Sequence, residues 1–304
     1  MTDHVLARKK TAGRETWCVS RFLSSHSCDS ATGASSQSAL IILNQPISNK
    51  SYLQRIWHNT AIHFCADGGA NRLYHAFEDN EERERYIPDY ICGDFDSIDT
   101  AVKDWYAAKG TIIDNSKDQD TTDFQKCLMV LNNVYEPTPE NDTPPPETST
   151  LSRLLFPHCL SPTLVSAEVS PPSPSKYEVV VLGALSGRFD HIMSSIHTLF
   201  MVAPERKVYL VSSESVAFLL RPGMHDIRCN TEIEGPTCGL IPIGVNIARV
   251  VTQGLKWNVD HSTPLSFPSL VSTSNAFAEG SGNEPVVHVE TDAPVVWTVE
   301  VNMH

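Results

Sequence analysis

The stretch AIHFCADGGANRLY (61–74), followed by DYICGDFDSID (89–99), decides the fold class. Each begins with a short apolar run that leads into glycine and aspartate, and a helix-like segment at 70–85 lies between the two runs. Strands that alternate with helices indicate right-handed crossovers and a mainly parallel, Rossmann-like sheet. Further strand-like runs occur at 38–46, 110–115, 176–187 and 206–213, and further helix-like segments at 99–110, 123–135 and 188–203.

The pattern changes near residue 216. From there the chain shows short β-branched runs separated by Gly, Pro and Asn, without a helical period, which predicts an all-β second domain, a sandwich. Residues 136–175 are crowded with Pro, Ser and Thr, so we expect a disordered insertion there. The predicted organisation is an irregular lead-in over 1–37, a catalytic α/β domain over 38–215, and a β-sandwich domain over 216–304.

Composition narrows the class of protein. A chain of 304 residues with 41% hydrophobic and 19% charged residues is typical of a soluble globular protein. The net charge of −13 argues against a nucleic-acid or anionic-membrane partner. The eight cysteines form no C-x-x-C pair, which favours reduced thiols, and no apolar run approaches membrane-spanning length. We therefore expect a cytoplasmic protein; the early basic residues also fit a mitochondrial presequence, although acidic residues interrupt them.

The carboxylates of GDFDS directly follow a presumed buried strand. On an extended segment, side chains two positions apart point the same way, so Asp94 and Asp96 would face one spot. That spot is the carboxyl edge of the sheet, where doubly wound folds bind ligands, and paired oxygens there suit Mg²⁺. The alternative is a turn whose aspartates cap the next helix, since Asp99 also precedes a helical stretch.

A second acidic cluster lies in KDQDTTDFQKC (117–127). Asp120 or Thr121 would serve as a helix N-cap, with Asp123 completing a capping-box-like pattern. Capping explains one or two carboxylates but not Asp118, Asp120 and Asp123 together. We therefore favour metal or phosphate chemistry for this cluster.

Two strand-to-helix turns supply the remaining candidates. In CADGGANRLY, Gly68 and Gly69 would let the backbone approach a phosphate, although the segment matches neither G-x-G-x-x-G nor a P-loop, and a tight turn explains it equally well. In GALSGRFDH (183–191), Arg188 opposes the helix dipole unless it binds a phosphate. Asp190 and His191 also fit as helix-start polar residues without a ligand.

With these motifs in order, the chain resembles the thiamin pyrophosphokinase family in its eukaryotic form. CADGGANRLY, GDFDSI, DQDTTDF, GRFDHIMSSIHTL, GLIPIG, GLKWN and VSTSN carry the resemblance, which runs from about residue 38 to the C-terminus without the 136–175 insertion. Ser186 stands where the family pattern has glycine. The resemblance implies a homodimer with active sites at the interface, and Mg²⁺-dependent transfer of diphosphate from ATP to thiamin, giving thiamin diphosphate and AMP.

The resemblance also implies roles for individual residues. The metal ligands would be Asp94, Asp96, Asp120 and Asp123, and the catalytic group would consist of Asp94, Asp96, Asp123 and Arg188. The ATP side would use Asp67, Gly68, Asn71, Arg72, Gln119, Thr122, Arg188, Asp190 and His191. The thiamin side would use Trp257, Ser274 and Asn275. An indole face attracts the cationic thiamin, whereas taken alone Trp257 would also fit a buried core position.

Two other functions use the same residues. A metal-dependent hydrolase of nucleotides would need the acidic clusters and would turn over ATP without thiamin. A nucleotide- or thiamin-sensing binding module would keep Trp257 but tolerate the loss of Asp96 and Asp123, and the intact acidic clusters argue against it.

Overall fold

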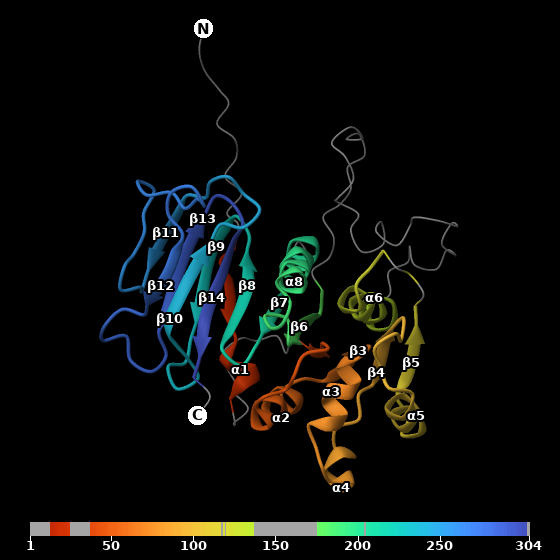
Figure 1. Cartoon of the computed structure of the whole chain (residues 1–304). Helices are drawn as coiled ribbons and strands as arrows, with labels where there is room; N and C mark the ends of the chain where they lie inside the picture. Colours follow the sequence, from red (N-terminus) through yellow and green to blue (C-terminus); the bar gives the residue numbers. More distant parts are fainter. Residues whose placement is uncertain are drawn as a thin grey trace. The chain divides into compact units, whose positions relative to one another are not determined.

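The structure is a computed structural model that describes residues 13–24, 37–116, 118, 120–136, 175–203 and 205–302. The chain divides into two compact units (Figure 1). The first, called here the α/β unit, is Arg21–Phe218. The second, called the β unit, combines Leu219–Asn302 with the described part of the segment that ends at Ser20.

A parallel sheet forms the centre of the α/β unit. Its strands follow the spatial order β7-β6-β2-β3-β4-β5, with the bounds Val208–Val211, Tyr177–Leu182, Gln37–Ile42, Ile62–Ala66, Tyr90–Gly93 and Ile112–Asn115. All neighbours in this order pair in parallel, and β8 (Ser215–Leu220) pairs antiparallel with β7. The α/β class expected from the alternating pattern is thus observed.

The order of the strands reverses between β2 and β6. The chain runs outward from β2 through β3 and β4 to β5, and then returns to place β6 on the other side of β2. Loops that leave the carboxyl ends of β2 and β6 therefore diverge and open a crevice, which is where open α/β sheets bind ligands. This arrangement positions the candidate site.

Helices cover both sides of this sheet (Figure 1), with α2, α3 and α5 on one side and α6 and α8 on the other. Their bounds, with those of the short α1 and α4, are Ser20–Leu23, Lys50–His58, Gly69–His75, Asn80–Arg83, Thr100–Ala108, Asp123–Tyr135 and Phe189–Val202, in the order α1 to α6 and then α8. Thr122 caps α6 and forms a capping box with Gln125, so the predicted caps Asp120 and Thr121 and the predicted box residue Asp123 are wrong, although α6 has the predicted bounds.

The predicted helix over 70–85 is wrong as a single element. α3 ends at His75, and α4 begins only at Asn80 because the Asp79 side chain accepts a hydrogen bond from Glu81 N–H and caps a new helix. Phe77, between the two helices, is buried and stacks on Tyr86. The chain therefore turns in order to bury an aromatic ring, which helical periodicity does not reveal.

The β unit contains two sheets. One has the order β1-β9-β13-β11, and the other contains the neighbours β12-β10-β14. The bounds are Glu15–Cys18, Gly223–Arg228, Val286–Thr291 and Val250–Gln253 for the first, and Ser272–Ala276, Glu234–Ile241 and Val295–Val301 for the second. Alternate residues of β9 and β13 are buried, which is the pattern of strands with one face on a core, whereas β14 begins with three buried residues in succession.

The expectation of an irregular lead-in is wrong for the part that the structure describes. β1 pairs in parallel with β9, more than two hundred residues further along the chain. Trp17 on β1 is buried and donates its indole N–H to His225 Nδ1 at 3.1 Å. The N-terminal segment therefore completes the β unit.

Glu234 is a buried acid at the start of β10. It is almost fully withdrawn from water, and its Oε1 is a buried atom without a hydrogen-bond partner. Burial raises the pKa of Glu234 to about 8, despite lowering contributions from Cys229 and Asn230. The neutral form of Glu234 therefore persists to a higher pH than that of an exposed glutamate.

Most of the predicted insertion, residues 137–174, lies outside the described residues. Its two ends meet at Glu136, whose Oε1 accepts a hydrogen bond from Ser175 Oγ at 2.8 Å. Arg206 is buried and pairs with the same carboxylate. This ion pair fixes the two ends side by side.

Candidate active site

Three carboxylates meet at the carboxyl edge of the parallel sheet. Asp67 follows β3, Asp94 follows β4, and Asp123 is the first residue of α6, with one carboxylate oxygen of each within 4.8 Å of the others. Gly93 makes this approach possible, because a Cβ at that position would lie 2.8 Å from Asp67 Cβ and 3.3 Å from Asp123 Oδ1. We refer to Asp67, Asp94 and Asp123 as the three-carboxylate cluster.

Asp67 is the fixed member of the cluster. Its side chain is buried, its backbone adopts a left-handed φ of 42°, and its carboxylate accepts hydrogen bonds from the backbone N–H groups of Ser97 and Ile98, each at 3.0 Å. Burial raises the pKa of Asp67 to about 6, partly offset by these donors, while Asp96 and Asp123 add to the rise. A cation bound beside Asp67 would favour its ionised form and so lower this pKa.

The pKa of Asp123 is also raised, first by burial and further by Asp94 and Asp96, although Lys126 opposes the rise. Oxygen donors of this kind, crowded together and partly buried, suit a hard divalent cation such as Mg²⁺. The donor set therefore fits the metal that the resemblance implies.

The extended geometry predicted for Asp94 and Asp96 is wrong. β4 ends at Gly93, and Phe95 has a left-handed φ of 63°, so the two aspartates lie in a turn. Asp96 accepts a hydrogen bond from Ser97 Oγ at 2.6 Å, and this bond lowers its pKa. Asp96 also lies beside Asp67, and when Asp67 is protonated its carboxyl group donates a hydrogen bond to Asp96, which lowers the pKa of Asp96 and raises that of Asp67. Asp96 therefore adjoins the cluster through a different contact from the one expected.

The remaining residues of the second acidic motif have local roles in the structure. Asp118 accepts hydrogen bonds from Asp120 N–H at 3.0 Å and Thr121 Oγ at 2.6 Å, while Asp120 itself is exposed. Thr122 caps α6 with its side chain. Gln119 lies outside the described residues.

Lys126 is the cluster neighbour that the sequence analysis missed. Its Nζ lies 3.0 Å from Asp123 Oδ1 and 3.9 Å from Asp94 Oδ2, and its side chain is only 2% exposed. The signal was available, because Asp123 and Lys126 are three positions apart at a helix start and therefore share a face.

The candidate nucleotide-side residues join neighbouring loops. Asn71 donates to the Ser97 carbonyl and accepts from Asp99 N–H, both at 3.0 Å. Arg72 donates from Nε to Asn44 Oδ1 at 2.8 Å. Gly68 is needed beside Asn44, whose Nδ2 would lie 2.3 Å from an added Cβ. Asn71 therefore fastens α3 to the loop after β4, and Arg72 fastens it to the loop after β2.

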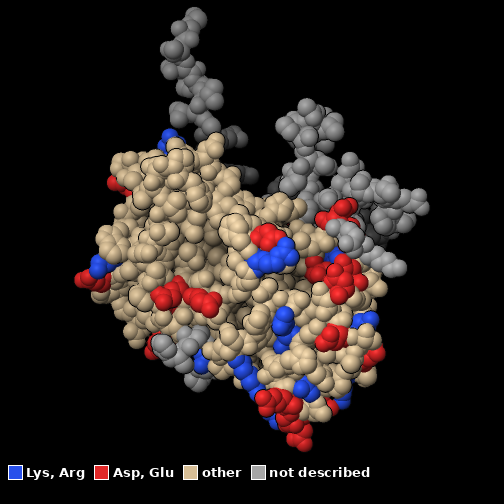
Figure 2. Space-filling model, in the orientation of Figure 1, with Lys and Arg blue, Asp and Glu red and all other residues tan. Residues whose placement is uncertain are grey.

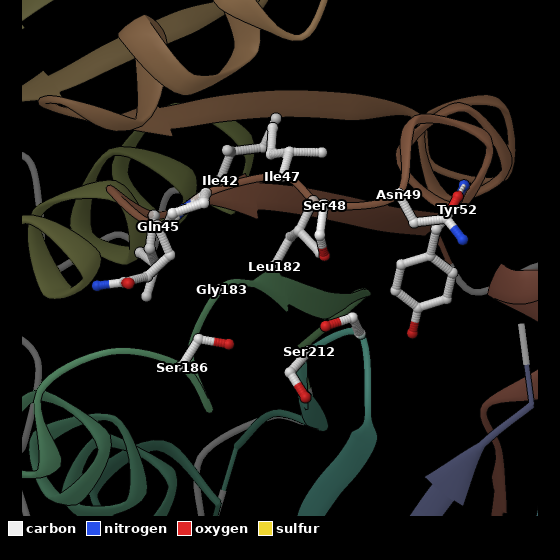
Figure 3. Close-up of a pocket in the computed structure, with 13 residues that line it drawn as sticks. Ile42, Gln45, Ile47, Ser48, Asn49, Tyr52, Leu182, Gly183, Ser186 and Ser212 are labelled. Carbon is white, nitrogen blue, oxygen red and sulfur yellow. Dashed lines mark hydrogen bonds between the residues drawn. The ribbon is translucent and has the colours of Figure 1, made fainter.

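A pocket occupies the crevice where the strand order reverses (Figure 3). Its walls come from the loop after β2, the end of β6 and the start of the loop after β7. Gly183 and Gly187 have left-handed φ values of 90° and 82°, and both pack against Gln45. The side chains on its walls that carry polar groups are Gln45, Ser48, Asn49, Tyr52, Ser186, Ser212 and Ser213.

Arg188, Asp190 and His191 are exposed at the start of α8. Arg188 donates from Nε to Asp190 Oδ1 at 3.1 Å and from a terminal nitrogen to Oδ2 at 2.5 Å. This pairing lowers the pKa of Asp190. It also offsets the unfavourable interaction between the positive charge of Arg188 and the helix dipole. On the face drawn in Figure 2, acidic and basic side chains lie in small groups rather than in one broad patch.

In the β unit, Trp257 is 57% exposed, so the alternative interpretation of Trp257 as a buried core residue is wrong. Asn275 is buried and holds the Trp257 backbone at both ends, accepting from Trp257 N–H at 3.2 Å and donating to its carbonyl at 2.8 Å. Lys256 Nζ lies 5.1 Å from the indole centroid. Ser274 is exposed, with a left-handed φ of 55°. An indole is thus presented at the surface by an amide clamp.

A carboxylate cluster and a polar pocket at one edge of a parallel sheet define an α/β protein suited to a metal and a phosphorylated ligand. Comparison with known proteins gives the particular family. The model of the thiamin pyrophosphokinase catalytic domain matches residues 53–210, and that of the thiamin pyrophosphokinase vitamin B1 binding domain matches residues 224–296.

Individual relatives agree. The chain is 37% identical over 275 residues to thiamine pyrophosphokinase 3 of Oryza sativa subsp. japonica, covering 88% of each chain. It is 35% identical to thiamine pyrophosphokinase 1 of Arabidopsis thaliana, covering 90% of each. The solved thiamin pyrophosphokinase from Candida albicans superposes with a TM-score of 0.73 at 28% identity, covering 95% of this chain and 93% of that one. The chain belongs to the thiamin pyrophosphokinase family in its eukaryotic form, and the expected enzyme class, thiamine diphosphokinase, is confirmed.

Proposed function

We propose that the protein transfers a diphosphate group from ATP to the hydroxyl of thiamin, giving thiamin diphosphate and AMP, and that the transfer requires Mg²⁺. The observation that carries the proposal is the three-carboxylate cluster, which lies within the segment matched by the catalytic-domain model. Burial and mutual repulsion make three neighbouring carboxylates costly, the single charge of Lys126 offsets only part of that cost, and a metal–polyphosphate substrate supplies further positive charge.

In this proposal Asp67, Asp94 and Asp123 hold the metal, with Asp96 and Asp120 beside them. When bound, the metal would neutralise charge on the phosphate oxygens during transfer. Ser97 and Ile98 keep Asp67 in place through their backbone N–H groups. Catalysis of this kind depends mainly on positioning and electrostatics, which rigid backbone donors supply.

ATP would occupy the crevice between the loops after β2 and β6. Gly68, Gln119 and His191 belong to this side, and Arg188 would exchange part of its pairing with Asp190 for a phosphate oxygen. Arg72 already hydrogen bonds to Asn44, so we assign it the role of holding the loop after β2. Asn71 bonds to the loop after β4 and Thr122 caps α6, so we assign them the role of fixing the segments that carry Asp94 and Asp123.

Thiamin would stack on Trp257, because the electron-rich face of an indole attracts its cationic ring. Asn275 would fix the position of that indole, and Ser274 would line the same surface. We further propose that the β unit is a sandwich, that the protein is a homodimer whose active sites lie at the interface, and that it functions in the cytosol. Within the described residues, no helix has the length and apolar character needed to cross a membrane.

The test is a product analysis with purified protein. The protein is incubated with ATP, with and without thiamin and with and without Mg²⁺, and the products are separated by chromatography. Thiamin diphosphate and AMP in equal amounts, formed only when both thiamin and Mg²⁺ are present, support the proposal. AMP formed without thiamin points to a hydrolase, and no turnover points to a binding module.

A further inference from the structure

Lys126 is a buried cation that lies against two members of the three-carboxylate cluster. It stands in the first turn of α6, three positions after Asp123, with 2% of its side chain exposed. Its ammonium contacts Asp123 at 3.0 Å and lies 3.9 Å from Asp94. The proposed metal would use these same carboxylates.

Two local preferences oppose a lysine at this place. The first turn of a helix favours anions, because its free backbone N–H groups carry partial positive charge. Burying an ammonium group is also unfavourable unless it is paired. The three carboxylates compensate for both costs, because they attract the ammonium group of Lys126. The lysine in turn reduces the repulsion among carboxylates that lie within 4.8 Å of one another.

We infer that Lys126 is a positioning residue that holds Asp94 and Asp123 together before a metal arrives and weakens the binding of a free divalent cation. A cation among these oxygens meets the positive charge of Lys126, so the lysine and the metal compete for the same carboxylates. A polyphosphate adds negative charge that offsets both cations. The site would therefore bind its metal tightly only as a metal–nucleotide complex. This part of the inference rests on the proposed function.

The first test measures the binding of free Mn²⁺ to the full chain by electron paramagnetic resonance, without nucleotide or thiamin. Lys126→Met keeps a long side chain but removes the charge, and Lys126→Arg keeps the charge as a matched control. We expect Lys126→Met to bind Mn²⁺ at least about tenfold more tightly than the wild type. Lys126→Arg should stay within about threefold of the wild type. Equal or weaker Mn²⁺ binding by a folded Lys126→Met protein would overturn the inference.

Thermal unfolding keeps the inference testable if Lys126→Met is unstable. Without metal, the variant should unfold at a lower temperature than the wild type because the carboxylates have lost their counter-charge. Mn²⁺ should raise its unfolding temperature more than that of the wild type, since the metal replaces the missing charge and binds more tightly. An equal rise in both proteins would contradict the role given to Lys126.

The requirement for a metal–nucleotide complex is tested with α,β-methylene-ATP. In this analogue a methylene group replaces the oxygen between the α- and β-phosphorus atoms, so the bond broken in the proposed reaction is absent. The analogue should tighten Mn²⁺ binding by a larger factor in the wild type than in Lys126→Met, and equal factors would overturn this requirement. If the analogue changes nothing in the wild type, the proposed ATP site is wrong. The result with free Mn²⁺ still decides the positioning role.

Discussion

Replacing Gly93 with alanine perturbs the three-carboxylate cluster without changing its charge. The added Cβ would lie 2.8 Å from Asp67 Cβ and 3.3 Å from Asp123 Oδ1. Carbon atoms in contact need about 3.5 Å, so Asp67 or the end of β4 must move by roughly 0.7 Å. Because Ser97 and Ile98 hold the Asp67 carboxylate, this movement disturbs the cluster directly. A misplacement of this size costs on the order of 10- to 100-fold in turnover, and overpacking costs about 1–3 kcal/mol of stability.

The assay measures kcat for thiamin diphosphate formation at saturating substrates and Mg²⁺, together with urea unfolding of the same samples. Ile91→Val is the matched control: it lies on the same strand, is fully buried, and costs about 0.5–1.5 kcal/mol without adding an atom beside the cluster. We expect the control to keep wild-type kcat. Wild-type kcat in a folded Gly93→Ala protein would refute the reasoning, and equal losses in both variants would assign the effect to destabilisation.

Three further predictions follow from single residues. Asp94→Asn should remain folded by circular dichroism but lose at least about 100-fold in kcat, because it removes a charge from the proposed metal site; near-normal turnover would exclude Asp94 from that site. Asn275→Ala should raise the KM for thiamin about tenfold and leave that for ATP unchanged, because Trp257 loses two backbone hydrogen bonds; parallel changes in both KM values would argue against a thiamin-specific role. The pKa of Glu234 is raised from 4.5 to about 8 in the folded protein, which therefore keeps a proton that the unfolded chain releases across this range. Its contribution to stability should fall by about 1.4 kcal/mol per pH unit as the pH rises through this window, and Glu234→Gln should remove that slope in urea unfolding at pH 6 and pH 8; identical slopes in both proteins would show that Glu234 ionises freely.

The parts of the fold that the sequence predicted are those with a strong local signal. β2 and β6 contain apolar runs at 39–42 and 179–182, and α6 has a periodic apolar face. β1 could not be found in this way, since a four-residue strand has no clear period and its partner β9 is remote in the chain. The break between α3 and α4 likewise depends on burying Phe77, which is a tertiary effect.

The site was predicted in composition but not in geometry. The sheet edge brings Asp94 and Asp123 together as expected, whereas Asp67, placed on the nucleotide side by motif, completes the cluster. The left-handed Phe95 diverts Asp96, and spacing along an extended strand cannot reveal such a turn. Lys126 was overlooked because a lysine in a first helical turn is normally exposed, and only the packed carboxylates explain its burial.

The most direct test of the central claim follows the phosphorus atoms of ATP. Reactions run in parallel with [α-³²P]ATP and [γ-³²P]ATP, with thiamin and Mg²⁺, are separated and counted. Transfer of a whole diphosphate predicts that the α label appears only in AMP and the γ label only in thiamin diphosphate, in equal molar amounts. The γ label in thiamin monophosphate, with the α label in ADP, would contradict the claim.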